Sequence, residues 1–470
     1  MESSPHNDVT DFDVVVIGSG PAGQKAAIQA AKAHAKVALI EQEPGVGGMC
    51  VHRGTIPSKT LRETAVQLSR ARRHSEMAGF RLREGVEVAE LMSRLHQVVD
   101  AHVGYIGRQI DRNGVTHIHG RARFVSPTQI EVQKISGEVR RINPRFVVLA
   151  TGSRPRNPPE IPVDHENILD SDSILSMIYL PASLTVLGGG VIATEYASMF
   201  AHLGVKVTMI ERVDRPLKFM DGELVERFLG AFVHSGGRFV GNAVVSEVAF
   251  DGVSRVITRL ASGEIIESDK LLVALGRSAN LEGLQIERAG LKATSRGLLE
   301  VDEHCRTVVP HIYAVGDVIG PPALAATAME QGRRAARHAL GLPPSTSSET
   351  IPVGIYSIPE MACVGLGEDE VLRREGAPGV VGRARFDEVA RGQISNIQDG
   401  LLKIVSDPSG RKLLGVHIVG EGASDLIHVA QMAMLGGLGA DDLVENIFNF
   451  PTLGEAYRVA AFDLLERRPG

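Results

Sequence analysis

The sequence predicts an α/β protein in which one βαβ arrangement occurs twice and an α+β domain follows. Three observations carry this prediction. An apolar run leads into a glycine-rich turn at residues 18–23, the same pattern returns at residues 188–193, and the chain after Ile351 alternates short strand and helix patterns. The length of 470 residues allows two to four domains.

The first βαβ unit starts at residues 13–17 (DVVVI), an apolar run typical of a strand buried on both faces of a parallel sheet. The turn GSGPAG at residues 18–23 follows at once. An alanine-rich stretch over residues 24–35 predicts a helix, and residues 37–40 predict the next strand, which ends at Glu41.

Each glycine of the first turn has a physical role. Gly18 permits the tight turn, Gly20 lets a pyrophosphate approach the backbone, and Gly23 lets the helix pack on the strand. Glu41 follows Gly23 by 18 residues, at a strand end where a carboxylate accepts hydrogen bonds from a ribose diol. A lone GxGxxG motif is weak, but strand, helix and acid in register predict a dinucleotide site.

The second unit repeats this pattern in the middle of the chain. Residues 184–187 predict a strand, residues 188–193 (GGGVIA) the turn, residues 194–203 a helix, and residues 205–210 a strand that ends at Glu211. The last motif position is alanine, which the pattern allows. The residues expected to hold a second dinucleotide here are Gly188, Gly190, Ala193 and Glu211.

The end of this second unit bears on the choice between NAD(H) and NADP(H). Glu211 favours an unmodified 2′-hydroxyl and hence NAD(H). Arg212 follows immediately and Arg215 is close. One of these arginines could bind a 2′-phosphate or stack on adenine. Alternatively, both arginines are solvated loop residues. The sequence favours NAD(H) without excluding NADP(H).

The remaining segments complete the predicted organisation. Residues 146–152 (FVVLATG) predict a buried strand and turn, and residues 154–162, with four prolines in nine residues, predict a linker. Residues 271–276 close the second unit at Gly276, and residues 311–316 predict a further strand before Asp317. Asp221 is interpreted as a helix cap. The expected domain boundaries are 1–152, 153–272, 273–345 and 346–470.

Composition excludes several classes of function. A net charge of −6 gives no whole-chain attraction to nucleic acid or anionic membranes. Three scattered cysteines are too few for a disulfide framework, and no Cys/His cluster has the spacing of a zinc site, so no metal is expected. The N-terminal segment does not resemble a signal peptide, and the apolar runs have strand length, so the expected compartment is the cytoplasm.

The whole chain, from DVVVIGSGPAG to FPTLGEAYRVAA, resembles the flavoprotein disulfide reductase superfamily. The segments YAVGDVIG, MEQGR and GIYSIPE extend the match nearly from end to end. This resemblance implies Rossmann-like FAD-binding and NAD(P)-binding domains, with the first interrupted by the second, and then a C-terminal α+β dimerisation domain. It also implies FAD as cofactor, NAD(H) and NADP(H) as substrates, and a homodimer or higher homo-oligomer.

The resemblance also assigns roles to individual residues. Lys59 would lie beside flavin N5 and stabilise negative charge there, and Glu195 would pair with Lys59; these two are the candidate catalytic residues. The remaining positions are expected to bind or line the cofactors: Gly18, Gly20, Gly23, Glu41, Cys50, Thr55, Thr151, Gly152 and Asp317 for FAD, and Gly188, Gly190, Ala193, Glu211, Arg212 and Gly276 for the nicotinamide nucleotide or its domain.

Two departures from the disulfide reductases define the expected chemistry. Thr55 stands where the second redox cysteine should follow Cys50, and Phe450 stands where an acid/base histidine should precede Glu455. Thiol and proton-transfer partner are both missing, so we expect no dithiol chemistry. Cys50 alone is either a thiol activated by Lys59 or a helix N-terminus, or a small residue kept near the flavin. Cys305 and Cys363 are expected to be structural.

These departures match a branch of the superfamily that carries the same GTIPSK segment and transfers hydride between NADPH and NAD⁺ in the Si-specific manner. The expected cycle is ping-pong through flavin N5, with one nicotinamide site used by both nucleotides. The alternatives are an NAD(P)H diaphorase or quinone reductase, a dihydrolipoamide dehydrogenase-like protein without dithiol activity, and a flavin-binding subunit or redox sensor with no turnover.

Overall fold

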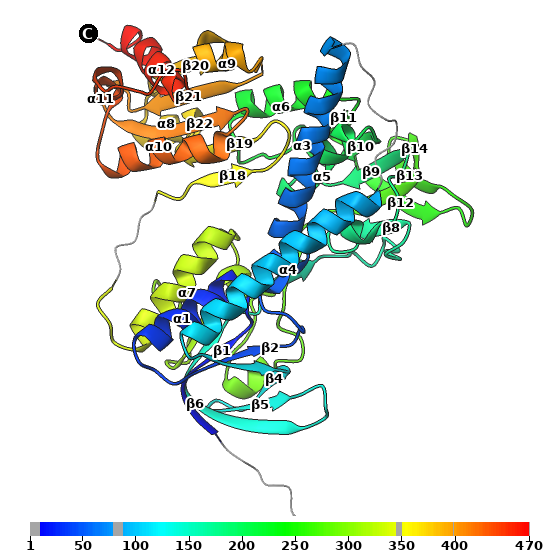
Figure 1. The fold of residues 1–470 in the computed structure, drawn as a ribbon, viewed down its shortest axis with the longest axis vertical. Helices are drawn as coiled ribbons and strands as arrows, with labels where there is room; N and C mark the ends of the chain where they lie inside the picture. The colour runs from blue at the N-terminus through cyan, green and yellow to red at the C-terminus, as the bar shows by residue number, and fades with distance from the viewer. Residues whose placement is uncertain (1–9, 79–87, 345–349, 398, 470) are drawn as a thin grey trace, which may run out of the picture. The chain divides into compact units, whose positions relative to one another are not determined.

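The computed structural model describes residues 10–78, 88–344, 350–397 and 399–469, which form two compact units. The first unit comprises Met1–Thr60, Glu90–Arg156 and Gly276–Thr346, and the second comprises Leu61–Ala89, Asn157–Leu275 and Ser347–Gly470. Figure 1 shows the course of the chain. Each unit contains a sheet with adjacent parallel strands, a glycine turn and a helix, so the predicted α/β class is confirmed. The boundaries at residues 152, 272 and 345 stay a prediction.

The first unit is built on a seven-stranded sheet in the order β3-β2-β1-β6-β5-β4, with β17 also pairing β6. The pairs among β1, β2, β3, β6 and β17 are parallel, whereas β4, β5 and β6 pair antiparallel. The strands are Thr10–Ile17 (β1), Val37–Glu41 (β2), Thr116–His119 (β3), Arg121–Ser126 (β4), Gln129–Gln133 (β5), Val139–Leu149 (β6) and Ile312–Ala314 (β17). The turns after β1 and β6 therefore lie at the same edge of the sheet.

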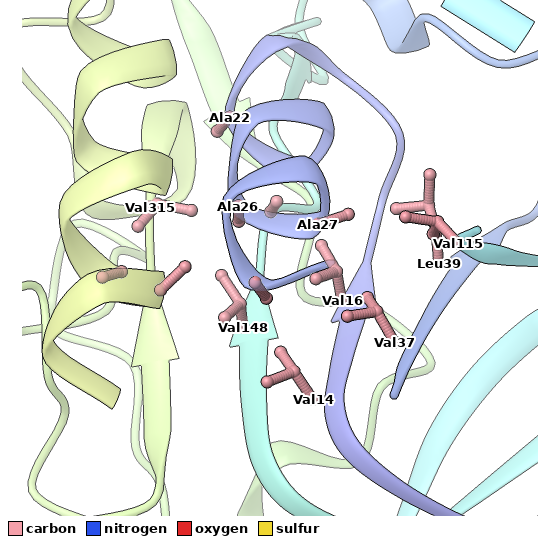
Figure 2. Packing of buried hydrophobic residues seen from close by; sticks show 14 of the residues in the cluster. Val14, Val16, Ala22, Ala26, Ala27, Val37, Leu39, Val115, Val148 and Val315 are labelled. Atoms are coloured by element: carbon pink, nitrogen blue, oxygen red, sulfur yellow. The ribbon is translucent and has the colours of Figure 1, made fainter. Parts of the chain in front are cut away.

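Helices α1 (Pro21–Lys32) and α7 (Ala325–Ala339) contact each other in this unit. Figure 2 shows Ala22, Ala26 and Ala27 of α1 beside the valines of the sheet. The backbones of the two helices approach each other very closely at Gly332 of α7, where a Cβ would lie 2.1 Å from the carbonyl oxygen of Ala22. The small side chains of both helices thus let α7 pack directly against α1.

Two predicted boundaries in this unit are corrected. The helix predicted over residues 24–35 begins at Pro21, since proline is well suited to the first helical position, and it ends at Lys32. The segment 154–162 was expected to be a linker, but its first residues belong to β7 (Ser153–Pro155), which pairs antiparallel with β16 (Arg277–Ala279). A proline is compatible with the end of a two-stranded ribbon, where no further strand needs its N–H.

The second unit contains a five-stranded sheet in the order β11-β10-β9-β15-β8, in which every pair is parallel. Its strands are Ile168–Asp170 (β8), Ser183–Leu187 (β9), Lys206–Ile210 (β10), Arg238–Val240 (β11) and Lys270–Val273 (β15). Helix α5 (Val191–His202) begins three residues before the predicted Thr194. Helix α6 (Gly222–His234) is capped by Asp221, whose side chain accepts the Glu223 N–H at 3.0 Å, so the cap interpretation is confirmed.

A second, antiparallel sheet in this unit has the order β18-β19-β22-β21-β20. Its strands are Val353–Ile355 (β18), Met361–Gly365 (β19), Val381–Arg385 (β20), Leu401–Ser406 (β21) and Leu413–Val419 (β22). Ile404 and Ile418 pack in one cluster with Ile427 of α10 (Ala423–Leu435) and Ala460 of α12 (Glu455–Glu466). The predicted α+β pattern after residue 351 is therefore confirmed.

Candidate functional site: two glycine turns and a lone thiol

The first glycine turn leaves one open position at the start of α1. A Cβ on Gly18, where φ is +101°, would lie 2.3 Å from the Ala150 carbonyl oxygen, and one on Gly23 would lie 1.9 Å from the Gly18 carbonyl oxygen. By contrast, no atom lies within 4 Å of a Cβ placed on Gly20, the residue that precedes α1. Gly20 therefore offers backbone to a ligand at a helix N-terminus, where an anion is favoured.

Glu41 lies against this turn. Its Oε2 accepts hydrogen bonds from the Ser19 backbone N–H at 2.8 Å and from the Ser19 hydroxyl at 2.6 Å, and the side chain is buried. Sequence reasoning missed Ser19, because the glycine motif specifies no residue type between its first two glycines. It also missed Gly47 and Gly48: Gly47 N–H donates to Ser19 Oγ at 2.9 Å, and a Cβ on Gly48 would lie 2.8 Å from Gly20 Cα. The adjacent glycines before Cys50 were the available signal.

Cys50 and Thr55 meet beside this turn. Cys50 lies on the short helix α2 (Gly48–His52), Thr55 begins α3 (Thr55–Ala78), and the Thr55 side chain is close enough to the thiol to act on its pKa. Burial raises the pKa of the Cys50 thiol above its ordinary value, although Thr55 and Lys59 act to lower it. The thiol is therefore mainly protonated near neutral pH, which disfavours the interpretation of Cys50 as an activated nucleophile.

The turn after β6 carries Thr151 and Gly152, and a hydrogen-bonded group supports Asp317 nearby. Ser153 Oγ donates to Asp317 Oδ2 at 2.5 Å, and Arg277 Nε donates to Ser153 Oγ at 2.7 Å. The Thr151 hydroxyl is buried and has no hydrogen-bond partner among the described residues. Because a buried hydroxyl seldom stays unpaired, Thr151 has capacity to bond a ligand. Ser153 and Arg277 gave no sequence signal.

The second glycine turn repeats this geometry in the other unit. A Cβ on Gly188, where φ is +113°, would lie 2.6 Å from the Ala274 carbonyl oxygen, whereas nothing lies within 4 Å of one on Gly190. Ala193 lies in the first turn of α5 and is fully buried. Glu211 lies against the turn, since its Oε2 would be 2.8 Å from a Cβ on Gly189. Arg212, whose N–H donates to Glu211 Oε1 at 2.6 Å, has an exposed side chain.

Comparison with known proteins identifies the family. The model of the pyridine nucleotide-disulphide oxidoreductases matches residues 12–332, and that of their dimerisation domain matches residues 351–461. The chain belongs to the pyridine nucleotide-disulphide oxidoreductase family. It is therefore an oxidoreductase of a family that depends on FAD and uses NAD(P)H.

Relatives and solved structures cover nearly the whole chain. A soluble pyridine nucleotide transhydrogenase of Mycobacterium tuberculosis is 43% identical over 97% of this chain and 98% of its own length, and one of Colwellia psychrerythraea is 40% identical with the same coverage. The crystal structure of LpdA from Mycobacterium tuberculosis matches with a TM-score of 0.88 at 29% identity, over 97% of this chain and 99% of LpdA. The flavoprotein disulfide reductase RclA from Escherichia coli matches with a TM-score of 0.86 at 26% identity, over 96% of this chain and 99% of RclA.

The residues of the first unit fit the FAD that this family uses. Gly20 leaves space at the N-terminus of α1, where a pyrophosphate would be stabilised, and the Thr151 hydroxyl has free hydrogen-bonding capacity. The predicted FAD residues all lie in this first unit: Gly18, Gly20, Gly23, Glu41, Cys50, Thr55, Lys59, Thr151, Gly152 and Asp317. Gly276 also belongs to this unit, and its carbonyl accepts the Arg156 N–H at 3.0 Å.

The candidate catalytic pair is divided between the two units. Lys59 lies on α3 in the first, and Glu195 lies on α5 in the second, together with Gly188, Gly190, Ala193, Glu211 and Arg212. The Glu195 side chain is only 4% exposed, and its Oε1 accepts the Tyr356 N–H at 2.8 Å. The pairing of Lys59 with Glu195 stays a prediction.

The position where the resemblance leads us to expect an acid/base histidine holds Phe450, which has no acid/base group. Phe450 is 69% exposed, and Glu455, which would orient a histidine, instead accepts the Thr452 N–H at 3.4 Å.

Among the described residues, no group of three or more His, Cys, Asp or Glu is arranged to hold a metal ion. The helices of that part of the chain include none with the length and apolar character of a membrane span.

Proposed function

We propose that this chain is an FAD-dependent transhydrogenase that exchanges hydride between NADPH and NAD⁺ in a ping-pong cycle on the Si face, with no redox disulfide. The observation that carries the proposal is the closeness of Thr55 to Cys50: the Thr55 side chain acts on the pKa of the Cys50 thiol, and Thr55 stands where the family resemblance leads us to expect the second redox cysteine. The three cysteines are all free. Two full-length relatives are named soluble pyridine nucleotide transhydrogenase, which supports the same activity here.

The proposed reaction balances without a proton donor. NADPH gives up a hydride and leaves as NADP⁺, and NAD⁺ then binds, takes the hydride and leaves as NADH. Bound FAD supplies the two-electron carrier that holds the hydride between the two half-reactions. Because no proton crosses to solvent, replacement of an acid/base histidine by Phe450 carries no penalty for this chemistry.

The chain's own residues bind and orient the reactants in this proposal. Gly18, Gly20 and Gly23 admit the FAD pyrophosphate to the N-terminus of α1. Lys59 stabilises negative charge beside the reacting ring, and Glu195 holds Lys59 in position. These assignments draw on the family resemblance and on the position of Lys59 close enough to Cys50 to affect the pKa of that thiol.

One nicotinamide site would serve both substrates, because it offers one residue for the adenosine ribose of NAD(H) and another for the 2′-phosphate of NADP(H). Glu211 lies against the second glycine turn, where its carboxylate accepts hydrogen bonds from the ribose diol of NAD(H). The exposed guanidinium of Arg212 is adjacent and would meet the 2′-phosphate of NADP(H). We infer that this juxtaposition lets a single pocket accept either nucleotide.

We also propose that the protein acts as a homodimer, with the cytoplasm as its expected compartment. Residues 351–461 match a dimerisation domain, and this part of the chain exposes several large apolar side chains. They include Met432, Leu435, Phe450 and Phe462. Apolar exposure of this extent is typical of a surface that a partner covers.

The experiment that tests the function is hydride transfer from NADPH to thionicotinamide-NAD⁺ by the FAD-loaded protein. The proposal expects rapid transfer, no reduction of lipoamide or glutathione disulfide, and a slower rate when a quinone replaces the NAD⁺ analogue. Faster turnover with the quinone would favour the diaphorase instead. Stereospecifically deuterated NADPH reports the face of transfer.

A further inference from the structure

One row of side chains crosses the antiparallel sheet of the second unit. Cys363 of β19 pairs with His417 of β22, His417 pairs with Lys403 of β21, and Lys403 pairs with Arg383 of β20. Directly paired residues of antiparallel strands point to the same face, so these four side chains form a continuous row. The opposite face of the sheet packs on α10 and α12, which leaves this row facing away from that core.

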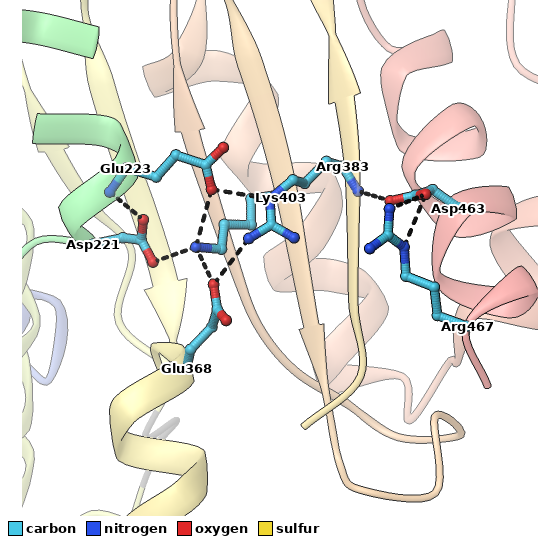
Figure 3. A network of polar contacts seen from close by, with 7 residues as sticks. All are labelled: Asp221, Glu223, Glu368, Arg383, Lys403, Asp463 and Arg467. Atoms are coloured by element: carbon cyan, nitrogen blue, oxygen red, sulfur yellow. Dashed lines mark hydrogen bonds and ion pairs between the residues drawn. The ribbon is translucent and has the colours of Figure 1, made fainter. Parts of the chain in front are cut away.

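The row contacts the start of α6, a helix that follows the second glycine turn in the sequence. Lys403 Nζ lies 2.8 Å from Asp221 Oδ2 and 3.3 Å from Glu223 Oε2, and it also pairs with Glu368. Arg383 Nε donates to Glu223 Oε2 at 2.9 Å. Figure 3 shows Asp221, Glu223 and Glu368 converging on the Lys403 ammonium.

The pair Lys403–Asp221 is buried and charged. Their side chains are 3% and 6% exposed. Burial disfavours the Lys403 cation, but Asp221 and Glu368 outweigh that effect and raise the pKa of Lys403, while the pKa of Asp221 is lowered. A buried ion pair contributes little net stability compared with apolar residues, although loss of one partner is costly. Its clearest effect here is to fix the position of Asp221.

The loop of residues 212–220 connects Glu211 to Asp221. At its centre, the Leu217 N–H donates to the carbonyl oxygen of Gly189 in the second glycine turn, at 2.8 Å. At its end, Met220 is buried, and its Sδ lies 3.6 Å from Cys363 Sγ, the first member of the row. The loop is thus fixed to the glycine turn on one side and to the polar row on the other.

We propose that Lys403 is a positioning residue for nicotinamide nucleotides, acting through Asp221 on the loop of residues 212–220 and so on the adenosine half of the ligand. This inference rests on the proposed nucleotide site at Gly188–Glu211, and it extends that site to a strand about 190 residues further along the chain. Lys403 itself is not proposed to touch the ligand. Its effect is to hold the loop in the conformation that binds adenosine diphosphate.

The test measures ADP-ribose binding by calorimetry with the FAD-loaded protein, because this probe carries the adenosine half and no nicotinamide. We expect Lys403→Met to weaken ADP-ribose binding about tenfold, as a displaced binding loop would. Asp221→Asn keeps the helix cap but loses the charge, and we expect a smaller loss in the same direction. Arg468→Met, which removes an ion pair with Asp441 elsewhere in the same unit, is the matched control and should bind normally.

A second readout separates positioning from general loosening. Reduced nicotinamide mononucleotide lacks the adenosine half, so its kcat/KM for flavin reduction should stay within about twofold of wild type in Lys403→Met. An equal loss with both ligands, or ADP-ribose affinity that stays unchanged, would overturn the role of Lys403. If Lys403→Met does not retain FAD, the same two measurements on Asp221→Asn, ADP-ribose affinity and kcat/KM for reduced nicotinamide mononucleotide, test the proposal in its place. Wild-type protein that fails to bind ADP-ribose would instead refute the proposed nucleotide site, and this inference with it.

Discussion

The side chain of Thr55 lies close enough to the thiol of Cys50, five residues before it in the chain, to act on the pKa of that thiol. The two side chains are therefore adjacent, as the halves of a disulfide would be, but only one of them contains sulfur. The scaffold around the pair is that of the pyridine nucleotide-disulphide oxidoreductases. The protein combines the nucleotide-binding architecture of this family with a site that cannot form the local disulfide.

Introducing the missing thiol tests this geometry. Thr55→Cys should form a disulfide with Cys50, because the side chain at position 55 already lies close enough to the Cys50 thiol to act on its pKa. Titration of free thiols in the denatured protein measures the bond. The variant should still not reduce lipoamide or glutathione disulfide, since Phe450 provides no acid/base group. Steady disulfide turnover by this variant would show that the acid/base function resides elsewhere.

Lys59 should matter for hydride transfer and not for the retention of FAD. We expect Lys59→Met to slow reduction of the flavin by NADPH about a hundredfold, the usual effect of removing one group that stabilises developing charge. Stopped-flow absorbance measures the rate, and the flavin-to-protein ratio checks the cofactor content. Lys32→Met, at an exposed lysine on α1, is the control. An unchanged rate in Lys59→Met would exclude the proposed electrostatic role.

The glycines of the first turn should differ sharply in their response to alanine. Gly23→Ala places a Cβ 1.9 Å from the Gly18 carbonyl oxygen and should lower the free energy of unfolding by about 1–3 kcal/mol. Gly20 has a φ of −64°, which alanine adopts. Gly20→Ala should therefore fold normally, with FAD binding about tenfold weaker because the methyl group enters the space for the pyrophosphate. Denaturation and flavin titration measure the two effects, and normal FAD affinity in Gly20→Ala would contradict the site.

Arg212 should discriminate between the two nucleotides. Arg212→Gln removes the charge proposed to meet the 2′-phosphate, so KM for NADPH should rise about tenfold while KM for the NAD⁺ analogue changes little. Arg238→Gln, at a surface arginine paired with Glu264 in the same unit, should alter neither value. Equal increases in both KM values for Arg212→Gln would show that Arg212 serves binding in general and not selectivity.

Cys305, which is buried, and Cys363, which is partly buried, lead us to expect a loss of stability in alkali. Burial raises the pKa of Cys305 to about 11 and that of Cys363 to about 12, from an ordinary value of 9.0. Above pH 9 the unfolded chain therefore releases protons that the folded chain retains, so the free energy of unfolding falls by about 1.4 kcal/mol per pH unit and thiol. Denaturant titrations from pH 8 to pH 10 measure the slope, and Cys305→Ala/Cys363→Ala should make it shallower. An identical slope in that variant would refute the assignment to these thiols.

Sequence predicted the parts of this molecule that depend on local pattern. The buried strand before Gly18, the glycine turns, the strand that ends at Glu41 and the strand that ends just before Glu211 all follow from periodicity and motif spacing within about 30 residues. Sequence did not predict the contacts that depend on strand register or on the return of a distant segment. The bonds of Ser19 with Glu41 and the row from Cys363 to Arg383 arise from pairing across strands, which single residue types do not encode.

In the proposed cycle, hydride passes from one nicotinamide to another with no thiol between them. Initial rates of transfer from NADPH to thionicotinamide-NAD⁺, measured with both concentrations varied on the FAD-loaded protein, test it most directly. We expect parallel double-reciprocal lines, because one site is used in turn by both nucleotides, and we expect loss of the flavin absorbance when NADPH is added alone. Flavin that NADPH does not bleach, or hydride transfer that needs both nucleotides bound together, would contradict it.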